Sequence, residues 1–263
     1  MPWHRRSLTV TGEAAIFQLM ADILVFGAHP DDAEFGMGAS MVKFVRSGAS
    51  VALCVLTRGE AGTFGTGEQR EQEMKDAARK LGGELTILSF RDCQVFDTFE
   101  SRVALAEVIR IYRPRIVFAP YHTNPSYHKD GAAHPDHSAV GTIVRSAARY
   151  ARFRGLKEVQ GEPWNAEHLF YYMVPRTRTP TLINDVTPYM EEWESIASCH
   201  TSQLNLRDGK VLESLRRFRE ANGNLIGVRY AEAFLTEEPL LFDLKSLMES
   251  TAQPGGAVQT AQT

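Results

Sequence analysis

Short apolar runs alternate with helix-like segments through the first half of the chain. Four runs of apolar, β-branched and aromatic residues have the length of strands, at residues 23–27, 50–57, 85–90 and 115–120. Such runs are typical of strands buried on both faces. The segments between them have helical composition, at residues 35–45, 68–81 and 103–112. This alternation predicts an α/β three-layer sandwich with a Rossmann-like, mostly parallel sheet flanked by helices.

The second half of the chain continues the pattern less regularly. Helices are expected over residues 138–150, 191–198 and 212–222, and strands over 169–174 and 182–186; residues 227–235 close the ordered part. We expect one domain over residues 20–248. Residues 1–19 would be an extension, disordered or not native, because Met20-Ala21-Asp22 is itself a plausible start. Residues 249–263 would be a disordered tail, since its small and polar residues have nothing to pack.

The first predicted strand ends in a cluster of polar residues, His29-Pro30-Asp31-Asp32-Ala33-Glu34. Proline cannot donate to a strand ladder and holds the residue before it extended, so the cluster follows the carboxyl end of the strand. In doubly wound α/β folds, ligands bind at that edge of the sheet. Asp32 could alternatively cap the next helix, a common role for aspartate. A metal site would need further ligands downstream.

A second polar cluster, His134-Pro135-Asp136-His137, follows the fourth predicted strand after a turn-rich loop. Because parallel strands end at one edge of a sheet, the two clusters are expected to face each other. Zinc in hydrolases takes three protein ligands from histidine and carboxylate side chains and keeps one position open for water. His29, Asp32 and His137 supply that set.

Three neighbouring residues are candidates for the rest of the chemistry. Asp31 lies beside a ligand without being needed as one, and it could act as the base toward a bound water. His134 could stabilise the oxyanion and protonate a leaving amine. Asp136 could hold the His134 ring through its second nitrogen. Four other histidines are interpreted as ordinary surface residues, namely His4, His122, His128 and His168.

Other ligand classes fit the sequence less well. Gly36-Met37-Gly38 lacks the third glycine of a dinucleotide fingerprint, because Met41 takes its place. The glycine-rich residues 58–67 are not followed by Gly-Lys-Ser/Thr, which argues against a P-loop; these glycines would rather let the backbone turn or approach a ligand. A phosphoryl-accepting receiver domain needs a lysine at a later strand end, and the fourth strand ends at Pro120 without one.

Composition narrows the partners and the compartment. A net charge of −3 and a pI near 6.3 argue against a surface for nucleic acid or anionic lipid, so small molecules are the expected partners. Cys54, Cys93 and Cys199 form neither a disulfide framework nor a CxxC pair, which fits a reducing cytosol. No apolar run reaches the roughly 18 residues of a membrane span. We therefore expect a cytoplasmic protein.

The two clusters together resemble the signature of the PIG-L/LmbE family of zinc-dependent N-deacetylases. The resemblance extends from about Asp22 to Leu244, and it includes residues 56–63, Arg113-Pro114, Thr201-Ser202-Gln203 and residues 227–234. It implies a Rossmann-like fold and Zn²⁺ held by His29, Asp32 and His137. It also implies Asp31 as the base, His134 as the polarising acid, and a homo-oligomer, since such relatives often form trimers or hexamers.

The C-terminal half is most similar to the bacterial branch that deacetylates N-acetylglucosaminyl-malate in bacillithiol biosynthesis. The resemblance thus implies a zinc-dependent hydrolase that removes acetyl from N-acetylglucosaminyl-malate or a similar glycoside. One alternative is a deacetylase of another N-acetyl sugar, such as a chitooligosaccharide or an antibiotic precursor. Another is a non-catalytic zinc- or sugar-binding protein of the same fold.

Two departures from the family pattern concern the substrate. Residues 122–133 form a longer interval before the second cluster than in close relatives, and they could reshape the mouth of the pocket. His200 stands where relatives tend to have tyrosine before the Ser-Gln pair. Arg58, at the end of the second strand, and His200 are the candidate substrate contacts. The alternatives are that Arg58 is an exposed structural arginine and that His200, which could assist the oxyanion, is only structural. Arg58, together with Arg229, would favour an anionic aglycone.

Overall fold

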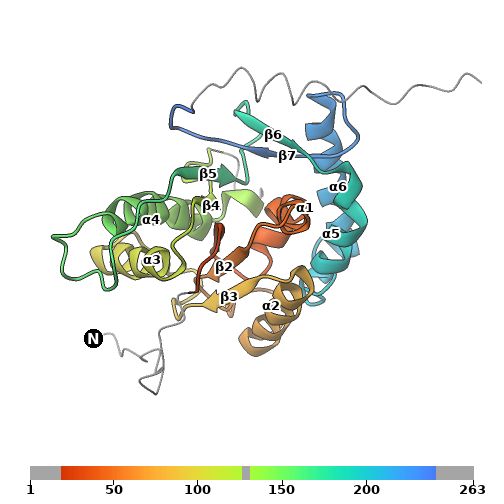
Figure 1. The fold of residues 1–263 in the computed structure, drawn as a ribbon. Helices are drawn as coiled ribbons and strands as arrows, with labels where there is room; N and C mark the ends of the chain where they lie inside the picture. The colour runs from red at the N-terminus through yellow and green to blue at the C-terminus, as the bar shows by residue number, and fades with distance from the viewer. Residues whose placement is uncertain (1–18, 126–130, 241–263) are drawn as a thin grey trace, which may run out of the picture.

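The computed structural model describes residues 19–125 and 131–240 (Figure 1). The predicted extension lies outside the described residues up to position 18, and the predicted tail of residues 249–263 lies outside them entirely. The predicted domain end at residue 248 is also outside. These boundaries therefore stay predictions. Within the described residues, no helix is long and apolar enough to cross a bilayer.

Five parallel strands form the central sheet. The strands are β1 (Ile23–Gly27), β2 (Val51–Val55), β3 (Glu84–Ile87), β4 (Ile116–Pro120) and β5 (His168–Tyr172). Their order is β3-β2-β1-β4-β5, with Ile23 of β1 paired to Val51 of β2 and to Ile116 of β4. The predicted α/β fold is confirmed. The strand order reverses between β1 and β4, and ligands bind at such a switch point in doubly wound folds.

Helices cover both faces of this sheet (Figure 1). On one face lie α3 (Phe99–Tyr112) and α4 (Pro135–Ala151), which pack on each other. On the other lie α1 (Asp32–Arg46) and α2 (Gly67–Leu81), with α5 (Met190–Ala197) packed on both. The antiparallel pair β6 (Leu182–Asp185) and β7 (Ala231–Phe234) and helix α6 (Val211–Asn224) complete the second half. Three short 3₁₀ helices span Gly131–Ala133, Thr187–Tyr189 and Gln203–Gly209.

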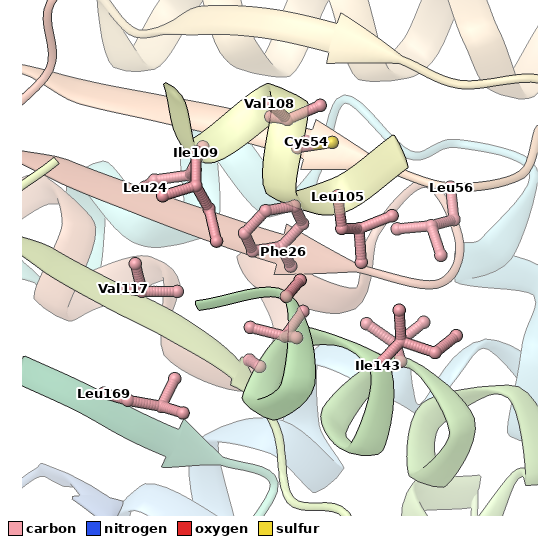
Figure 2. Packing of buried hydrophobic residues seen from close by; sticks show 14 of the residues in the cluster. Leu24, Phe26, Cys54, Leu56, Leu105, Val108, Ile109, Val117, Ile143 and Leu169 are labelled. Atoms are coloured by element: carbon pink, nitrogen blue, oxygen red, sulfur yellow. The ribbon is translucent and has the colours of Figure 1, made fainter. Parts of the chain in front are cut away.

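The two cores follow from the alternation of side chains along each strand. Leu24 and Phe26 of β1 point to the α3–α4 face, where they pack with Leu105 and Ile143 (Figure 2). Ile23 and Val25 point to the opposite core, under α1 and α2. Because both faces are covered, every residue of β1 and β2 is buried, which explains why these strands read as unbroken apolar runs.

Helices α1 and α4 each begin three residues earlier than the apolar pattern predicts, because a polar residue takes the N-cap of each. Asp31 occupies the N-cap of α1 and makes no side-chain capping bond. The alternative in which Asp32 caps this helix is therefore wrong, since Asp32 lies in the first turn. In α4, Pro135 takes the first helical position, and His134 is the N-cap. Proline suits this position because the first amides of a helix have no partner within it.

Helix α1 is interrupted at Met37, whose backbone (φ −147°, ψ 21°) is not helical. The two glycines beside it leave room for aromatic side chains. A Cβ at Gly36 would lie 2.5 Å from Cδ2 of Tyr172, and one at Gly38 would lie 2.7 Å from Cδ1 of Trp193. Gly36-Met37-Gly38 thus serves close packing around a helix break, consistent with the absence of a dinucleotide fingerprint.

Substitution of Gly36 by alanine tests this packing. Although alanine favours a helix, its methyl group would overlap the ring of Tyr172, which is fully buried and donates a hydrogen bond from its hydroxyl to the Phe26 carbonyl. We expect Gly36→Ala to lower the free energy of unfolding by about 1–3 kcal/mol, measured by urea denaturation. Gly155→Ala is the matched control, because no atom lies within 4 Å of its Cβ position. Equal stability of the two variants would contradict the overlap.

Candidate functional site

A cavity of about 540 Å³ is lined by both polar clusters and by the loops that follow β2 and β3. The two clusters follow β1 and β4, the strands that flank the switch point of the sheet. The predicted convergence of the clusters is therefore what the structure shows. The polar residues that line the cavity are His29, Asp31, Asp32, Thr63, Arg70, Asp92, His134, His137, Arg176, Gln203 and Ser214.

His29 is the centre of the polar cluster. Its Nδ1 lies 3.3 Å from Nε2 of His137. Its Nε2 faces the opposite way, 3.0 Å from Oδ1 of Asp92 and 3.3 Å from Oδ2 of Asp136. A neutral His29 ring whose Nε2 proton is donated to these carboxylates would have its lone pair on Nδ1, which faces His137. A carboxylate on the outer nitrogen is the usual support of a metal-ligating histidine.

Asp32 and His137 are oriented in a comparable way. Oδ2 of Asp32 accepts hydrogen bonds from the amides of Ala28 (2.7 Å) and His29 (2.9 Å), while Oδ1 lies 3.0 Å from Nε2 of His137. The other nitrogen of His137 lies 3.4 Å from the Ala132 carbonyl oxygen. Backbone groups thus hold one atom of each side chain and direct the other toward a common point.

The donor atoms of these three residues have the spacing of a tetrahedral zinc site. Ligand atoms about 2.0–2.1 Å from one ion are separated by roughly 3.4 Å. Here His29 Nδ1 lies 3.3 Å from His137 Nε2, and His137 Nε2 lies 3.0 Å from Oδ1 of Asp32. The 3.7 Å separation between His29 Nδ1 and Asp32 runs to the other carboxylate oxygen, Oδ2. The residues present therefore fit such an ion. Among the described residues, the groups whose ligand atoms all lie close to one another are His29 with His134 and His137, and His29 with Asp92 and Asp136; neither of these groups includes Asp32.

The electrostatic balance of the cluster favours a cation. Burial opposes charging of His29, yet Asp32, Asp136 and Asp92 outweigh it and raise the pKa of His29 to about 12. Burial likewise opposes charging of Asp32, but His137 and His29 hold the pKa of that carboxyl well below its usual range. Three buried carboxylates surrounding two imidazoles are an excess of negative charge, which a divalent cation would neutralise.

Asp31 lies in the cavity wall beside this group, in an unusual backbone conformation. Its φ of 107° is rare for residues with a side chain, and such strain is found preferentially at functional sites. Nη2 of the buried Arg70 lies 3.5 Å from Oδ2 of Asp31, and the same atom donates to the Pro30 carbonyl. Burial raises the pKa of Asp31, and Arg70 partly offsets this, giving about 6. Such a carboxyl can accept and release a proton near neutrality.

His134 and Asp136 differ from their expected arrangement. The Asp136 carboxylate contacts His29 and accepts the Cys93 amide, whereas His134 interacts with the Asp136 backbone amide, which donates to Nδ1. The expectation that the Asp136 carboxylate holds the His134 ring is therefore wrong. Burial and the neighbouring rings of His29 and His137 lower the pKa of His134. With Nδ1 accepting, the neutral ring carries its proton on Nε2 and can donate a hydrogen bond from it without being an imidazolium.

The two predicted substrate contacts do not line the cavity. Arg58 is exposed and pairs with Glu68 and Glu71 on α2. His200 is fully buried, with Nε2 3.6 Å from Oε2 of the equally buried Glu34. Neither lies among the cavity-lining residues. Arg58 lies outside the cavity because it pairs with carboxylates of α2 instead. His200 is buried because the segment that follows it, Thr201-Ser202-Gln203, is anchored to Glu73 of α2, which accepts hydrogen bonds from the hydroxyls of Thr201 and Ser202.

Two charged residues that contact predicted site residues were not themselves predicted. Asp92 follows β3, so the rule that ligands gather at the carboxyl ends of parallel strands could have included it. Arg70 belongs to α2 and reaches back to the Gly59 and Pro30 carbonyls. Its position is made possible by Gly59, whose φ is +65° and whose missing side chain leaves room for the guanidinium. That packing has no local sequence signal beyond the glycines themselves.

The chain is similar in sequence and fold to several known proteins. The family model described as PIG-L, GlcNAc-PI de-N-acetylase, matches residues 24–148. The chain is 31% identical to a diacetylchitobiose deacetylase of Thermococcus kodakarensis, over 82% of this chain and 83% of that protein. It is 27% identical to a 1D-myo-inositol 2-acetamido-2-deoxy-alpha-D-glucopyranoside deacetylase of Saccharopolyspora erythraea, over 73% and 80%. A crystal structure of a conserved protein from Thermus thermophilus superposes with a TM-score of 0.76 at 35% identity, covering 86% and 98%.

Proposed function

The chain belongs to the PIG-L/LmbE family of N-deacetylases, and from this we propose that it is a zinc-dependent hydrolase that removes acetyl from N-acetylglucosamine joined to a further group. The observation that carries the proposal is the convergence of His29 Nδ1, His137 Nε2 and the Asp32 carboxylate, 3.0–3.7 Å apart, beside Asp31 in one cavity. These three residues would hold the ion. A bound zinc ion would supply a Lewis acid that acidifies water and polarises the amide carbonyl.

The chain's own residues then manage the protons. Asp31 accepts a proton from the attacking water, a role that suits a buried carboxyl with a pKa of about 6. His134 donates a hydrogen bond from Nε2 to the oxygen of the tetrahedral intermediate and keeps its proton, because its Nδ1 already accepts the Asp136 amide. Asp31 returns its proton to the amide nitrogen as the C–N bond breaks. Acetate and a free amine are the products.

The rest of the cavity suits a sugar conjugate. Its wall is largely apolar and includes two aromatic rings, which fits the hydrophobic face of a pyranose ring. The apolar residues are Phe35, Met173, Val174, Leu206, Val211, Leu215 and Phe218. The relatives named above are deacetylases of a chitobiose and of an inositol glycoside, so a neutral ring is the favoured aglycone. Arg58 lies outside the cavity, which removes one argument for the malate conjugate of bacillithiol biosynthesis.

A substrate panel tests the proposal. The zinc-loaded protein is assayed for acetate and free amine with diacetylchitobiose, the N-acetylglucosamine conjugates of inositol and of malate, and free N-acetylglucosamine. We expect release from at least one conjugate, with kcat/KM higher for neutral rings than for malate. Zinc binding without release from any compound would support the rival, a non-catalytic metal- or sugar-binding protein. Preference for malate would restore the bacillithiol assignment.

The carboxylates behind His29 provide a second test. Asp136→Asn and Asp92→Asn keep the side-chain size but weaken the acceptor of the His29 Nε2 proton. Loss of such outer support typically lowers metal affinity by about 10–100-fold. We expect a decrease of this size for each variant in zinc competition against a chromogenic chelator. Asp97→Asn, whose carboxylate pairs with Arg102, is the matched control. Unchanged affinity in both site variants would argue against His29 as a ligand.

A further inference from the structure

The break in helix α1 is filled by a pair of charged side chains. In a regular helix the Ala39 amide would donate to the Phe35 carbonyl, four residues earlier. Here the Ala39 amide donates to Oε1 of Glu232 (3.2 Å), and the Phe35 carbonyl accepts from Nη2 of Arg219 (3.0 Å). Glu232 and Arg219 are themselves joined, with Nε 2.8 Å from Oε1. An ion pair from α6 and β7 thus takes the place of one backbone hydrogen bond.

Neighbouring groups complete the same arrangement. The Ser40 amide donates to Oε2 of Glu232 (2.7 Å), and Nε1 of Trp193 donates to the Glu34 carbonyl (2.8 Å). The guanidinium carbon of Arg219 lies 3.9 Å from the centre of the Trp193 ring. Arg219 is 1% exposed and Glu232 2%. Three elements of the second half of the chain, α5, α6 and β7, therefore hold the break from one side.

Stability alone does not account for this ion pair. A continuous helix would pair the same backbone groups without burying two charges, and a buried ion pair usually contributes little net stability. The break instead sets the direction of the helix segment that precedes it. The segment before the break, residues 32–36, directly follows the strained Asp31. It includes Asp32, whose Oδ1 lies 3.0 Å from Nε2 of His137. A small rotation of this segment would separate those two atoms.

We propose that Arg219 and Glu232 are positioning residues for the site, which set the direction of residues 32–36 and thereby the placement of Asp31 and Asp32. The roles of these two aspartates rest on the proposed function. Neither residue is among the cavity-lining residues, and the bonds of the two side chains are made to the backbone of α1 and α6 and to each other rather than to the predicted ligands. The pair acts through the backbone of α1, by holding the Phe35 carbonyl and the Ala39 and Ser40 amides.

The experiment compares Arg219→Lys and Glu232→Gln with the wild-type protein. Each variant keeps a polar group of similar size but cannot make the full set of bonds. We expect Co²⁺ affinity to fall about tenfold or more, with an altered visible spectrum of the bound Co²⁺, as for loss of a ligand's outer support. In the acetate-release assay, kcat should fall while KM changes little. Amide hydrogen exchange over residues 32–40, measured on the metal-free protein, should become faster.

Arg110→Lys is the matched control for general destabilisation. Arg110 is also a buried arginine that donates to backbone carbonyls, those of Ala151, Phe153 and Gly161, but it lies on α3 across the sheet. We expect this variant to lower Tm without changing Co²⁺ affinity or exchange over residues 32–40. The proposal is overturned if Arg219→Lys and Glu232→Gln behave like this control. Amide hydrogen exchange can be measured whether or not the protein is active. Absence of acetate release from the wild-type protein would therefore count against the proposed function, while the exchange of residues 32–40 would still decide the role of Arg219 and Glu232.

Discussion

Replacing Asp31 by asparagine is expected to lower the rate of acetate release by about 10²–10⁴-fold while zinc stays bound. The amide cannot accept the proton of the attacking water, and the three proposed ligands are untouched. Asparagine is the right replacement because it tolerates positive φ better than other residues, and Asp31 has a φ of 107°. The measurements are zinc content by atomic absorption and kcat with the best substrate of the panel.

Two comparisons make this result interpretable. Asp31→Ala removes the same proton acceptor but adds backbone strain, so it should lose activity and also unfold at lower temperature. Asp22→Asn changes an exposed aspartate that pairs with Ser50, far from the cavity lining, and should keep full activity. If Asp31→Asn retained near wild-type turnover with zinc bound, Asp31 would not be the base.

Replacing His137 by alanine is expected to abolish zinc binding at micromolar protein and, with it, activity. Loss of a supporting group typically lowers metal affinity by about 10–100-fold, so loss of one of three direct ligands should exceed about 100-fold. Of the three proposed ligands, His137 lies closest to the other two, with Nε2 3.0 Å from Oδ1 of Asp32 and 3.3 Å from Nδ1 of His29. The measurement is isothermal titration with Zn²⁺, together with acetate release.

The wild-type protein treated with a strong chelator should show the same loss, reversed by added zinc. His122→Ala is the matched control, because His122 pairs with Glu237 and does not line the cavity. Zinc affinity in His137→Ala equal to that of the control would remove His137 from the ligand set. It would point instead to the second group of converging side chains, His29 with Asp92 and Asp136.

The fold was predictable because burial leaves a direct trace in the chain. A parallel strand covered on both faces must be apolar throughout, and Ile23–Gly27 and Val51–Val55 are. The site could be located for a related reason. The apolar runs of the first and fourth strands stop at prolines, Pro30 and Pro120, and the two polar clusters lie at or after these strand ends, so the clusters are placed at the same edge of the sheet.

The orientation of side chains was less predictable. Whether the Asp136 carboxylate faces His134 or His29 depends on the Cys93 amide, which is contributed by a loop 43 residues away. The burial of His200 depends on Glu34 and on the anchoring of residues 201–203 by Glu73. Arg70 reaches Asp31 only because residues 59 and 62 lack side chains. These orientations depend on tertiary contacts between residues far apart in the sequence, so no local sequence pattern predicts them.

The interrupted helix has a consequence for how the protein matures. Every proposed ligand lies between residues 29 and 137, and the ribosome produces these residues first. The groups that complete α1, at positions 193, 219 and 232, emerge about 60 to 100 residues later. A nascent chain can therefore contain all three proposed ligands before residues 32–36 of α1 have their final direction. Tight capture of the ion would be a late event, reached when the last strand docks, which would limit premature metal uptake during synthesis.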